Sequence, residues 1–332
     1  MSNDKHTPPG NGKPVLSTAP DVLAGRGRRT VHLGDLLFGG SARASSLIIV
    51  VVVLIIGAFL LGNAWQPLLD NTANFFTSTT FDSSSRPPHF GVAALLWTTV
   101  LSSLIALLIA VPVAVGIALL LTQYVGGRVS RWIGFVIDLL AAVPSVIFGL
   151  WGIKVLGPAL QPVAHWMQAH LGWFPLFGST QVTSPGTVFT ASLVLALMIL
   201  PIITAVTRDV FAQTPREQIE AALALGATRW EVIRMAVLPY GRSGATAAAM
   251  LGLGRALGET IAVMLILSAS SFDVSVFSGG ETFASVIARN AAEFDTTYKA
   301  GIYISAGLVL FVLTFAVNAL ARIVAERGKA KS

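Results

Sequence analysis

The stretch Gly252-Leu-Gly-Arg-Ala-Leu-Gly-Glu-Thr260 places two opposite charges inside a long apolar segment. An arginine at the centre of a bilayer costs about 2.5–3.5 kcal/mol on scales derived from membrane insertion. Arg255 and Glu259 are four residues apart, so one continuous helix would present both on the same face. Such a pair is a hypothesis for a functional site that faces a water-filled path. It is equally compatible with a structural ion pair between helices, and the pair alone does not decide.

The composition around this stretch is that of a membrane protein. The 332 residues are 54% hydrophobic and 11% charged, whereas soluble domains carry about 25% charged residues. Six apolar segments are each long enough to cross about 30 Å of hydrocarbon as a helix. We therefore predict an all-α, polytopic membrane protein with six transmembrane helices, at residues 44–65, 92–121, 132–154, 186–206, 244–269 and 300–321.

Most lysines and arginines fall on one side of these predicted spans. Cytoplasmic segments of membrane proteins are enriched in basic residues, so both termini are predicted to lie in the cytoplasm. The first segment is rich in proline and glycine and reads as disordered. The predicted organisation is a cytoplasmic tail at 1–43, a first transmembrane helix at 44–65, an outer polar loop at 66–91, a five-helix core at 92–325 and a cytoplasmic tail at 326–332.

Several function classes are disfavoured by what the sequence lacks. It has no cysteine, and its five histidines form no H-E-x-x-H motif, so a metal centre is not expected. No segment fits the phosphate-binding loop G-x-x-x-x-G-K-[ST], so no nucleotide is expected to bind this chain. The net charge of +6 follows from the cytoplasmic basic residues and does not indicate nucleic acid. We expect a transport subunit, not an enzyme, with no bound cofactor or metal.

Small residues and prolines mark the predicted helices. Gly252, Gly254 and Gly258 remove side-chain bulk and are predicted to allow close helix approach at a subunit interface. Spans two, three and four each contain a proline, which removes a backbone donor and favours a kink. Kinked packing is the simpler interpretation, and kinks that shape a central path are the functional one. These prolines are Pro112, Pro144 and Pro201.

Two further features are ambiguous. Asp138 lies near the inner end of span three, within two turns of Arg131, which favours a carboxylate that reaches the interface over a functional one. Residues 158–185 have no acidic or basic side chain other than histidine but include Trp166, Trp173, Phe174 and Phe177, and they are predicted to lie at headgroup depth as an interfacial loop or short helix.

The segment 207–242 predicts two short helices in a cytoplasmic loop. Thr214 and Glu217 have the spacing of a capping box, and Gly226 is a natural helix stop in the left-handed conformation. Thr228 and Glu231 then predict the start of a second helix, which is expected to end before Pro239.

The spacing Glu220-Ala221-Ala222, three residues, Gly226, nine residues, Ala236-Val-Leu-Pro239 resembles the loop of ATP-binding-cassette importer permeases. The resemblance implies the type I importer permease fold and a loop that docks into a separate ATPase subunit, with Glu220, Ala221, Ala222 and Gly226 as docking residues. Ala236 departs from the family, which usually has Ile or Val there.

Within that family the chain resembles the phosphate-specific permeases, from about residue 65 onward. Residues 110–119 and 141–152 carry part of the likeness, and Gly254-Arg-Ala-Leu-Gly-Glu-Thr-Ile-Ala-Val263 is the most specific match. Ile-Ala-Val after Gly-Glu-Thr is similar to the PstC type of subunit and not to the PstA type. The resemblance implies phosphate translocation involving Arg255 and Glu259. It also implies a PstA-type permease, two copies of a PstB-type ATPase that binds ATP-Mg, and an external PstS-type binding protein as partners, besides membrane lipid and without nucleic acid.

Three rival functions stay open at this point. A permease for sulfate, molybdate or a phosphonate would carry the same loop. A self-sufficient secondary transporter would couple to protons through Glu259 and Asp138. A membrane scaffold that senses phosphate would retain its pairing and signalling without transport.

Overall fold

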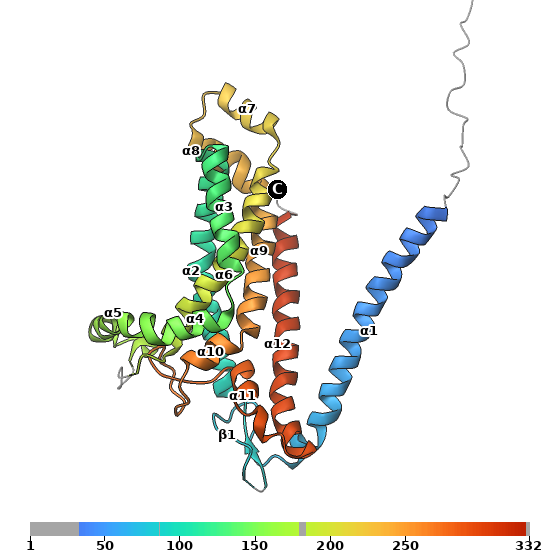
Figure 1. Ribbon diagram of the computed structural model, residues 1–332, viewed down its shortest axis with the longest axis vertical. Helices are drawn as coiled ribbons and strands as arrows, with labels where there is room; N and C mark the ends of the chain where they lie inside the picture. Colours follow the sequence, from blue (N-terminus) through green and yellow to red (C-terminus); the bar gives the residue numbers. More distant parts are fainter. Residues whose placement is uncertain (1–32, 86, 179–183, 330–332) are drawn as a thin grey trace, which may run out of the picture. The chain divides into compact units, whose positions relative to one another are not determined.

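The computed structural model describes residues 33–85, 87–178 and 184–329, and these residues are mostly helical (Figure 1). The chain forms two units, residues 1–53 and 54–332. Helix α1 (Leu33–Asp70) begins in the first unit and ends in the second. The predicted disordered tail at 1–43 is therefore too long, because residues 33–43 contain no proline and continue the helix toward its N-terminus. Residues 1–32 of that predicted tail lie outside the described residues.

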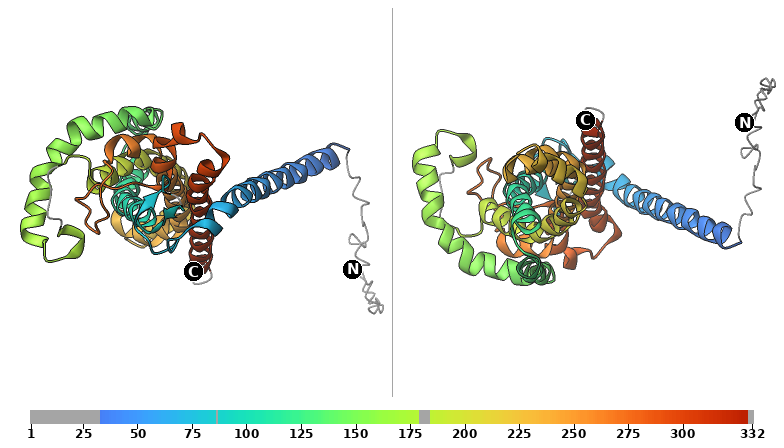
Figure 2. Two further views of the ribbon diagram at one scale, coloured as in Figure 1. Left: turned by 90° about the horizontal axis from the view of Figure 1, so that it is seen from below. Right: turned by 90° about the horizontal axis from the view of Figure 1, so that it is seen from above.

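Four long helices of the second unit run side by side (Figures 1 and 2). The alanines of α2 explain the close packing: Ala106, Ala110 and Ala114 recur every four residues, and none is exposed. Small side chains on one face let neighbouring helices approach closely. These four helices are α2 (Ala93–Leu119), α6 (Val188–Ala212), α9 (Leu238–Gly258) and α12 (Thr297–Lys329).

Helix α6 lies at the centre of this bundle. Its most apolar stretch is 67% buried, against 28% for the corresponding stretches of α2 and α12. The core around α6 is almost entirely aliphatic, with Leu195, Ile199 and Ile203 fully or almost fully buried. Helix α12 extends to Lys329, so residues 326–329 of the predicted C-terminal tail are helical, and 330–332 lie outside the described residues.

The predicted third span at 132–154 is wrong as a single helix. Helix α3 (Gly127–Ala141) ends before Pro144, and α4 (Ser145–Trp151) begins directly after it. Proline disfavours helical geometry in the preceding residue and lacks the N–H that a continuing helix requires. Pro144 therefore separates two helices, whereas Pro112 and Pro201 lie inside α2 and α6 as predicted.

After α4 the chain stays helical through a π-helical turn, η2 (Gly152–Leu156), into α5 (Gly157–Leu171). The run from α4 to α5 lies crosswise to the four-helix bundle (Figures 1 and 2). Its mean hydropathy of 1.4 is below the 2.2–3.0 of the other long apolar helices. Both observations agree with the prediction that the segment after residue 158 lies along the membrane interface.

The two ends of the bundle differ. The loop end carries α7 (Arg216–Ala224) and α8 (Arg229–Val232), and the hairpin end carries the two-stranded β1–β2 sheet and α11 (Figure 1). In the sheet, Phe81 pairs with Phe90 and Asp82 with His89 in antiparallel register. The remaining short elements are β1 (Phe81–Asp82), β2 (His89–Phe90), η1 (Leu120–Tyr124), η3 (Pro175–Phe177), η4 (Ile233–Val237), α10 (Ile261–Ile266), α11 (Phe283–Arg289) and η5 (Ala291–Glu293).

By length and composition, five helices in the described part of the chain qualify as membrane spans: Gly40–Asp70, Ala93–Tyr124, Ser145–Leu171, Val188–Ala212 and Thr297–Ile323. The predicted count of six is not confirmed. Residues 244–269 do not form one continuous helix, because α9 ends at Gly258 and α10 starts at Ile261.

Candidate functional site

The Arg255–Glu259 stretch contains a break between α9 and α10. Arg255 lies in the last turn of α9, and Glu259 is already extended, with φ −67° and ψ 123°. The expectation that both charges share one helix face is therefore wrong. Gly254 and Gly258 weaken the end of α9, because glycine is a poor helix former by about 1 kcal/mol relative to alanine. A sequence made of apolar residues and glycines predicts a span here but does not mark where it breaks.

The carboxylate of Glu259 is used to start α10. Its Oε1 accepts a hydrogen bond of 3.3 Å from the backbone N–H of Ala262. This local bond satisfies one of the donors that a helix start leaves unpaired. Arg255, in contrast, is exposed and has neither an ion pair nor a hydrogen bond within the described residues. The cation thus remains available for a ligand, while the carboxylate has a structural partner.

The three glycines of this stretch occupy different environments. A Cβ at Gly252 would lie 2.7 Å from Cδ1 of Ile203, so this glycine permits close packing of α9 on α6 within the chain. A Cβ at Gly254 or Gly258 would meet nothing within 4 Å. Gly258, Arg255 and the neighbouring Leu251 are exposed. This open face of α9 and α10 is the part of the stretch that another molecule can contact.

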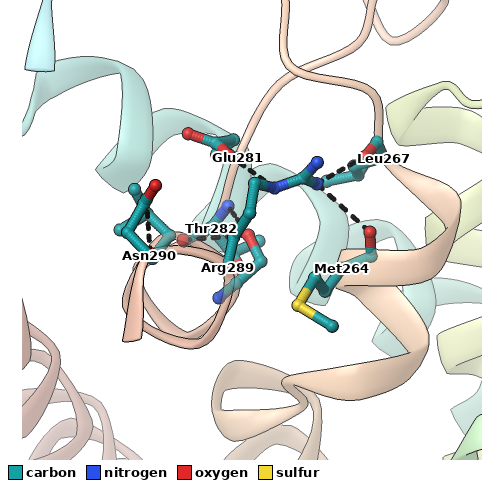
Figure 3. A network of polar contacts seen from close by, with 8 residues as sticks. Met264, Leu267, Glu281, Thr282, Arg289 and Asn290 are labelled. Atoms are coloured by element: carbon teal, nitrogen blue, oxygen red, sulfur yellow. Dashed lines mark hydrogen bonds and ion pairs between the residues drawn. The ribbon is translucent and has the colours of Figure 1, made fainter. Parts of the chain in front are cut away.

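A second arginine, Arg289, fixes the far end of α10 (Figure 3). Its Nη2 donates to the carbonyl oxygens of Met264 at 3.1 Å and Leu267 at 2.9 Å, and its Nε lies 2.9 Å from Oε1 of Glu281. Burial raises the pKa of Glu281 above its ordinary value, and the nearby charge of Arg289 acts in the opposite direction. Cations near a helix C-terminus are favourable because they meet unpaired carbonyls. We call Arg289, Glu281 and these two carbonyls the Arg289 clamp.

Sequence reasoning missed the clamp. Two of its three contacts are to backbone carbonyls 22 and 25 residues away, and a carbonyl leaves no mark in a sequence. The one available signal was the pairing of Glu281 with Arg289, eight residues apart around the capped start of α11.

A cavity of about 510 Å³ lies beside the clamp at the hairpin end. Its walls carry three carboxylates, those of Asp82, Asp273 and Glu281, and the buried residue Thr98. A cationic group matches such a lining better than an anion does. The other lining residues are Thr79, Thr80, Phe81, Ala94, Leu95, Ser270, Ser271, Phe272, Gly279 and Gly280.

The predicted docking residues meet in one groove at the loop end. Ala221, Ala222 and Gly226 line a groove of about 600 Å³ between α7 and the helix that follows it. Gly226 has φ +83°, so the predicted left-handed stop is confirmed. Glu220 is exposed on α7 and does not line the groove. The other lining residues are Gln218, Leu225, Ala227, Glu231, Met235 and Ala236.

Only one of the two predicted capping boxes forms. Thr228 and Glu231 cap α8 reciprocally, and these hydrogen bonds lower the pKa of Glu231. Thr214 instead is buried and donates to the carbonyl of Phe211 at 2.9 Å, which leaves Pro215 as the N-cap of α7. The second loop helix also fails to end before Pro239, because proline is tolerated in the first turn of a helix. Helix α8 continues through η4 into α9.

Asp138 is exposed on α3, and the structure gives it no ion pair within the described residues. The described residues also contain no group of three or more His, Cys, Asp or Glu side chains placed to hold a metal ion. The candidate functional residues of this region are therefore those at the two ends of α10.

A bundle of apolar helices with a two-helix loop at one end is an architecture found among membrane transporter subunits. Three solved transporter structures have the same fold at 15–16% sequence identity. An inward-facing MetNI methionine ABC transporter has a TM-score of 0.53, covering 71% of this chain and 96% of its own. A bacterial ABC transporter for alginate import has a TM-score of 0.52 and covers 88% of this chain and 98% of its own. A bacterial alginate ABC transporter in complex with a periplasmic protein that binds an alginate pentasaccharide has a TM-score of 0.54 and covers 90% of this chain and 98% of its own. The chain has the type I importer permease fold.

Sequence comparison gives the family. Residues 97–329 match the family described as binding-protein-dependent transport system inner membrane component. Phosphate transport system permease protein PstC 2 of Mycobacterium bovis is 57% identical over 302 residues, 90% of this chain and 93% of the relative. The PstC protein of Mycobacterium leprae is 58% identical over 80% of this chain and 84% of the relative. The PstC protein of Mesorhizobium japonicum is 36% identical over 96% of this chain and 98% of the relative. The chain therefore belongs to the binding-protein-dependent transport permeases, among those of the PstC type.

Proposed function

We propose that this chain is one of two membrane subunits of an ATP-driven inorganic phosphate importer. The relatives named for phosphate transport support the choice of cargo, since they match the chain almost from end to end. The observation that supports a phosphate site most directly is Arg255. Its guanidinium is exposed and unpaired among the described residues, on a helix of the bundle and beside the open faces of Gly254 and Gly258.

The chemistry of Arg255 suits a phosphate path. A guanidinium offers forked donors that match two phosphate oxygens, which the single ammonium of lysine does not copy. Glu259 is engaged with Ala262, so we assign it the role of holding the α9–α10 break open beside the path, rather than that of pairing with Arg255. A path at the open face of α9 would be completed by a second, PstA-type permease.

The two ends of the bundle suit two different partners. The groove of about 600 Å³ at the loop end has the small apolar lining that a docked helix or loop requires, and we assign it to a PstB-type ATPase, present in two copies and carrying ATP-Mg. The acid-lined cavity at the hairpin end suits a basic group of an external PstS-type binding protein. We assign the loop end and both termini to the cytoplasmic side of a bacterial plasma membrane, and we expect no cofactor on this chain.

The test is uptake of labelled phosphate by vesicles that contain the complete transporter. Arg255→Lys keeps the charge but loses the fork, and losing one charge-assisted hydrogen bond of about 1.5–3 kcal/mol lowers uptake roughly tenfold or more. Arg242→Lys, an exposed arginine on the same helix near the loop end, is the matched control and should transport normally. Excess unlabelled phosphate should compete, whereas sulfate, molybdate and a phosphonate should not.

Two outcomes would overturn this proposal. Near-normal uptake by an Arg255→Leu, Glu259→Leu double variant at normal membrane levels would show that neither side chain is needed for translocation. Phosphate uptake by vesicles that contain this chain alone would favour a self-sufficient secondary transporter over an ATP-driven importer.

A further inference from the structure

Helix α3 presents an apolar face that the described residues of its own unit leave exposed. Gly134 and Ile137 are buried on the side that packs against α6. On the opposite side Trp132 is 70% exposed and Phe135 58%, followed by Val136 at 59% and Leu139 at 60%. An uninterrupted apolar strip of this kind on a multi-span protein indicates contact with lipid or with another membrane subunit.

The first turns of this face form a basic and aromatic hollow. A cavity of about 500 Å³ is lined by Arg128, Arg131, Trp132 and Phe135. Arg128 comes three and four residues before Arg131 and Trp132, and Phe135 comes four and three residues after them, so the four side chains lie on one side of the helix. Trp132 and Phe135 meet edge to face with ring centroids 6.2 Å apart, which fixes the apolar wall of the hollow.

The two cations in this hollow have no partner in the part of the chain that the structure describes. Neither Arg128 nor Arg131 makes an ion pair or hydrogen bond among the described residues. The nearby Arg208 of α6 is paired with Asp209 at 3.2 Å. The acid on the same helix, Asp138, comes about two turns after Arg131. The hollow therefore holds an uncompensated double positive charge.

The position of the hollow along α3 indicates which kind of molecule binds there. Helix α3 begins near the loop end (Figure 1), and its basic and aromatic residues precede Val136, Leu139 and Leu140, with Asp138 as the one charged residue among them. Basic side chains followed by Trp and Phe, then by hydrocarbon-facing residues, reproduce the order of a bilayer from headgroup to acyl chain. A second permease subunit would need acidic side chains at this depth inside the membrane boundary, which is a costly placement.

We propose that the hollow on α3 is a binding site for one anionic glycerophospholipid. Arg128 and Arg131 hold the headgroup phosphate, Trp132 and Phe135 pack on the glycerol and upper acyl region, and the acyl chains follow Val136 and Leu139. The site depends on membrane insertion with the loop end at the leaflet that is rich in anionic lipid. It is independent of which anion the transporter carries.

The experiment uses Trp132 as a reporter in the complete transporter. The protein is placed in phosphatidylcholine vesicles that contain a small fraction of brominated phosphatidylglycerol or, for comparison, of brominated phosphatidylcholine. Attraction by each basic residue near an anionic surface corresponds to a factor of about five, so two give roughly 25-fold preference at most. We expect stronger quenching by the anionic lipid, and loss of this excess in the Arg128→Gln, Arg131→Gln variant.

Matched variants complete the design. Trp132→Phe should remove the excess quenching, which shows that the signal comes from this site. Arg216→Gln, Arg234→Gln removes the same charge from exposed positions in the loop region and should leave the excess unchanged. Both variants change exposed residues, and their assembly is checked by gel filtration.

Three results would overturn the lipid site. The first is equal quenching by the anionic and zwitterionic lipids. The second is no quenching of Trp132 by either lipid in the complete transporter, which would show that another subunit covers α3. The third is loss of the excess on addition of inorganic phosphate, which would identify the hollow as a site for the free anion.

Discussion

Two interruptions of the helical chain, the loop between α7 and α8 and the break between α9 and α10, each contain glycine and a capping carboxylate. They differ in which contacts stabilise them. In the loop, Gly226 adopts φ +83° and Glu231 bonds reciprocally with Thr228, so neighbours in sequence fix the turn. At the break, Glu259 makes one local bond, and the far end of α10 is held by Arg289, from a distant segment.

This difference teaches where stability resides in the two regions. A turn fixed by its own residues keeps its geometry when its surroundings change. A six-residue helix is too short to be stable alone and depends on tertiary contacts at both ends. The loop is therefore a preformed docking element, and α10 is a segment whose position depends on the Arg289 clamp.

The largest effect is expected at the docking groove. Ala222→Asp places a charge in the wall of the groove, where binding of a partner would leave it desolvated, so the ATPase should no longer co-purify. Ala224→Asp, two residues along the same helix and outside the groove lining, is the matched control and should retain the ATPase. Normal co-purification with Ala222→Asp would refute the docking assignment.

Removing the clamp should have the next largest effect. Arg289→Gln loses three contacts and leaves the half-buried Glu281 without its cation, which should destabilise the hairpin end by roughly 1–3 kcal/mol. Hydrogen exchange should increase in α10 and leave α7 and α8 unchanged. Lys299→Gln breaks a surface pair with Asp295 and should change stability by less than about 0.5 kcal/mol. Equal effects of the two substitutions would show that the clamp contributes little.

The same substitution at two glycines isolates the cost of backbone strain, because a Cβ at either site meets no neighbouring atom within 4 Å. Gly226→Ala puts a Cβ on a left-handed residue and should destabilise the loop by about 1–2 kcal/mol, although no atom lies within 4 Å of that Cβ. Gly258→Ala meets equally open space at the end of a helix and should be neutral or slightly stabilising. Thermal unfolding of the purified transporter measures both. A loop that tolerates Gly226→Ala would contradict the claim that its turn is fixed by local geometry.

Acidification should have the smallest effect, and opposite signs in the two regions. The pKa of Glu231 is lowered from 4.5 by its bonds to Thr228, so its stabilisation is present above that value and is lost as the pH falls through the lowered pKa. The pKa of Glu281 is raised from 4.5 by burial, so the folded state binds its proton first and stability falls as the pH rises between 4.5 and the raised value.

Glu231→Gln and Glu281→Gln variants should each remove one of these slopes from the pH dependence of unfolding. If both variants shift the profile in the same direction, the two carboxylates do not differ in the way described.

The sequence predicted what depends on local chemistry and missed what depends on distant contacts. Gly226, Thr228 and Glu231 were predicted correctly, because their partners are within three residues. The capping box at Thr214 was wrong, because the carbonyl of Phe211 competed for the hydroxyl. Four of the long apolar helices were predicted by hydropathy alone, whereas the interruptions at Pro144 and Glu259 divided the other two predicted spans.

The continuation of α8 through η4 into α9 joins the docking groove to the α9–α10 break in one uninterrupted helix. From Arg229 to Gly258 this helix is about 45 Å long at 1.5 Å per residue. The π-helical turn η4 and Pro239 lie within this run, and helices bend at such positions. A movement imposed on α8 by a docked partner therefore reaches Gly258 and Arg255 only to the extent that this turn keeps its shape, and the helical path ends where the chain becomes extended at Glu259.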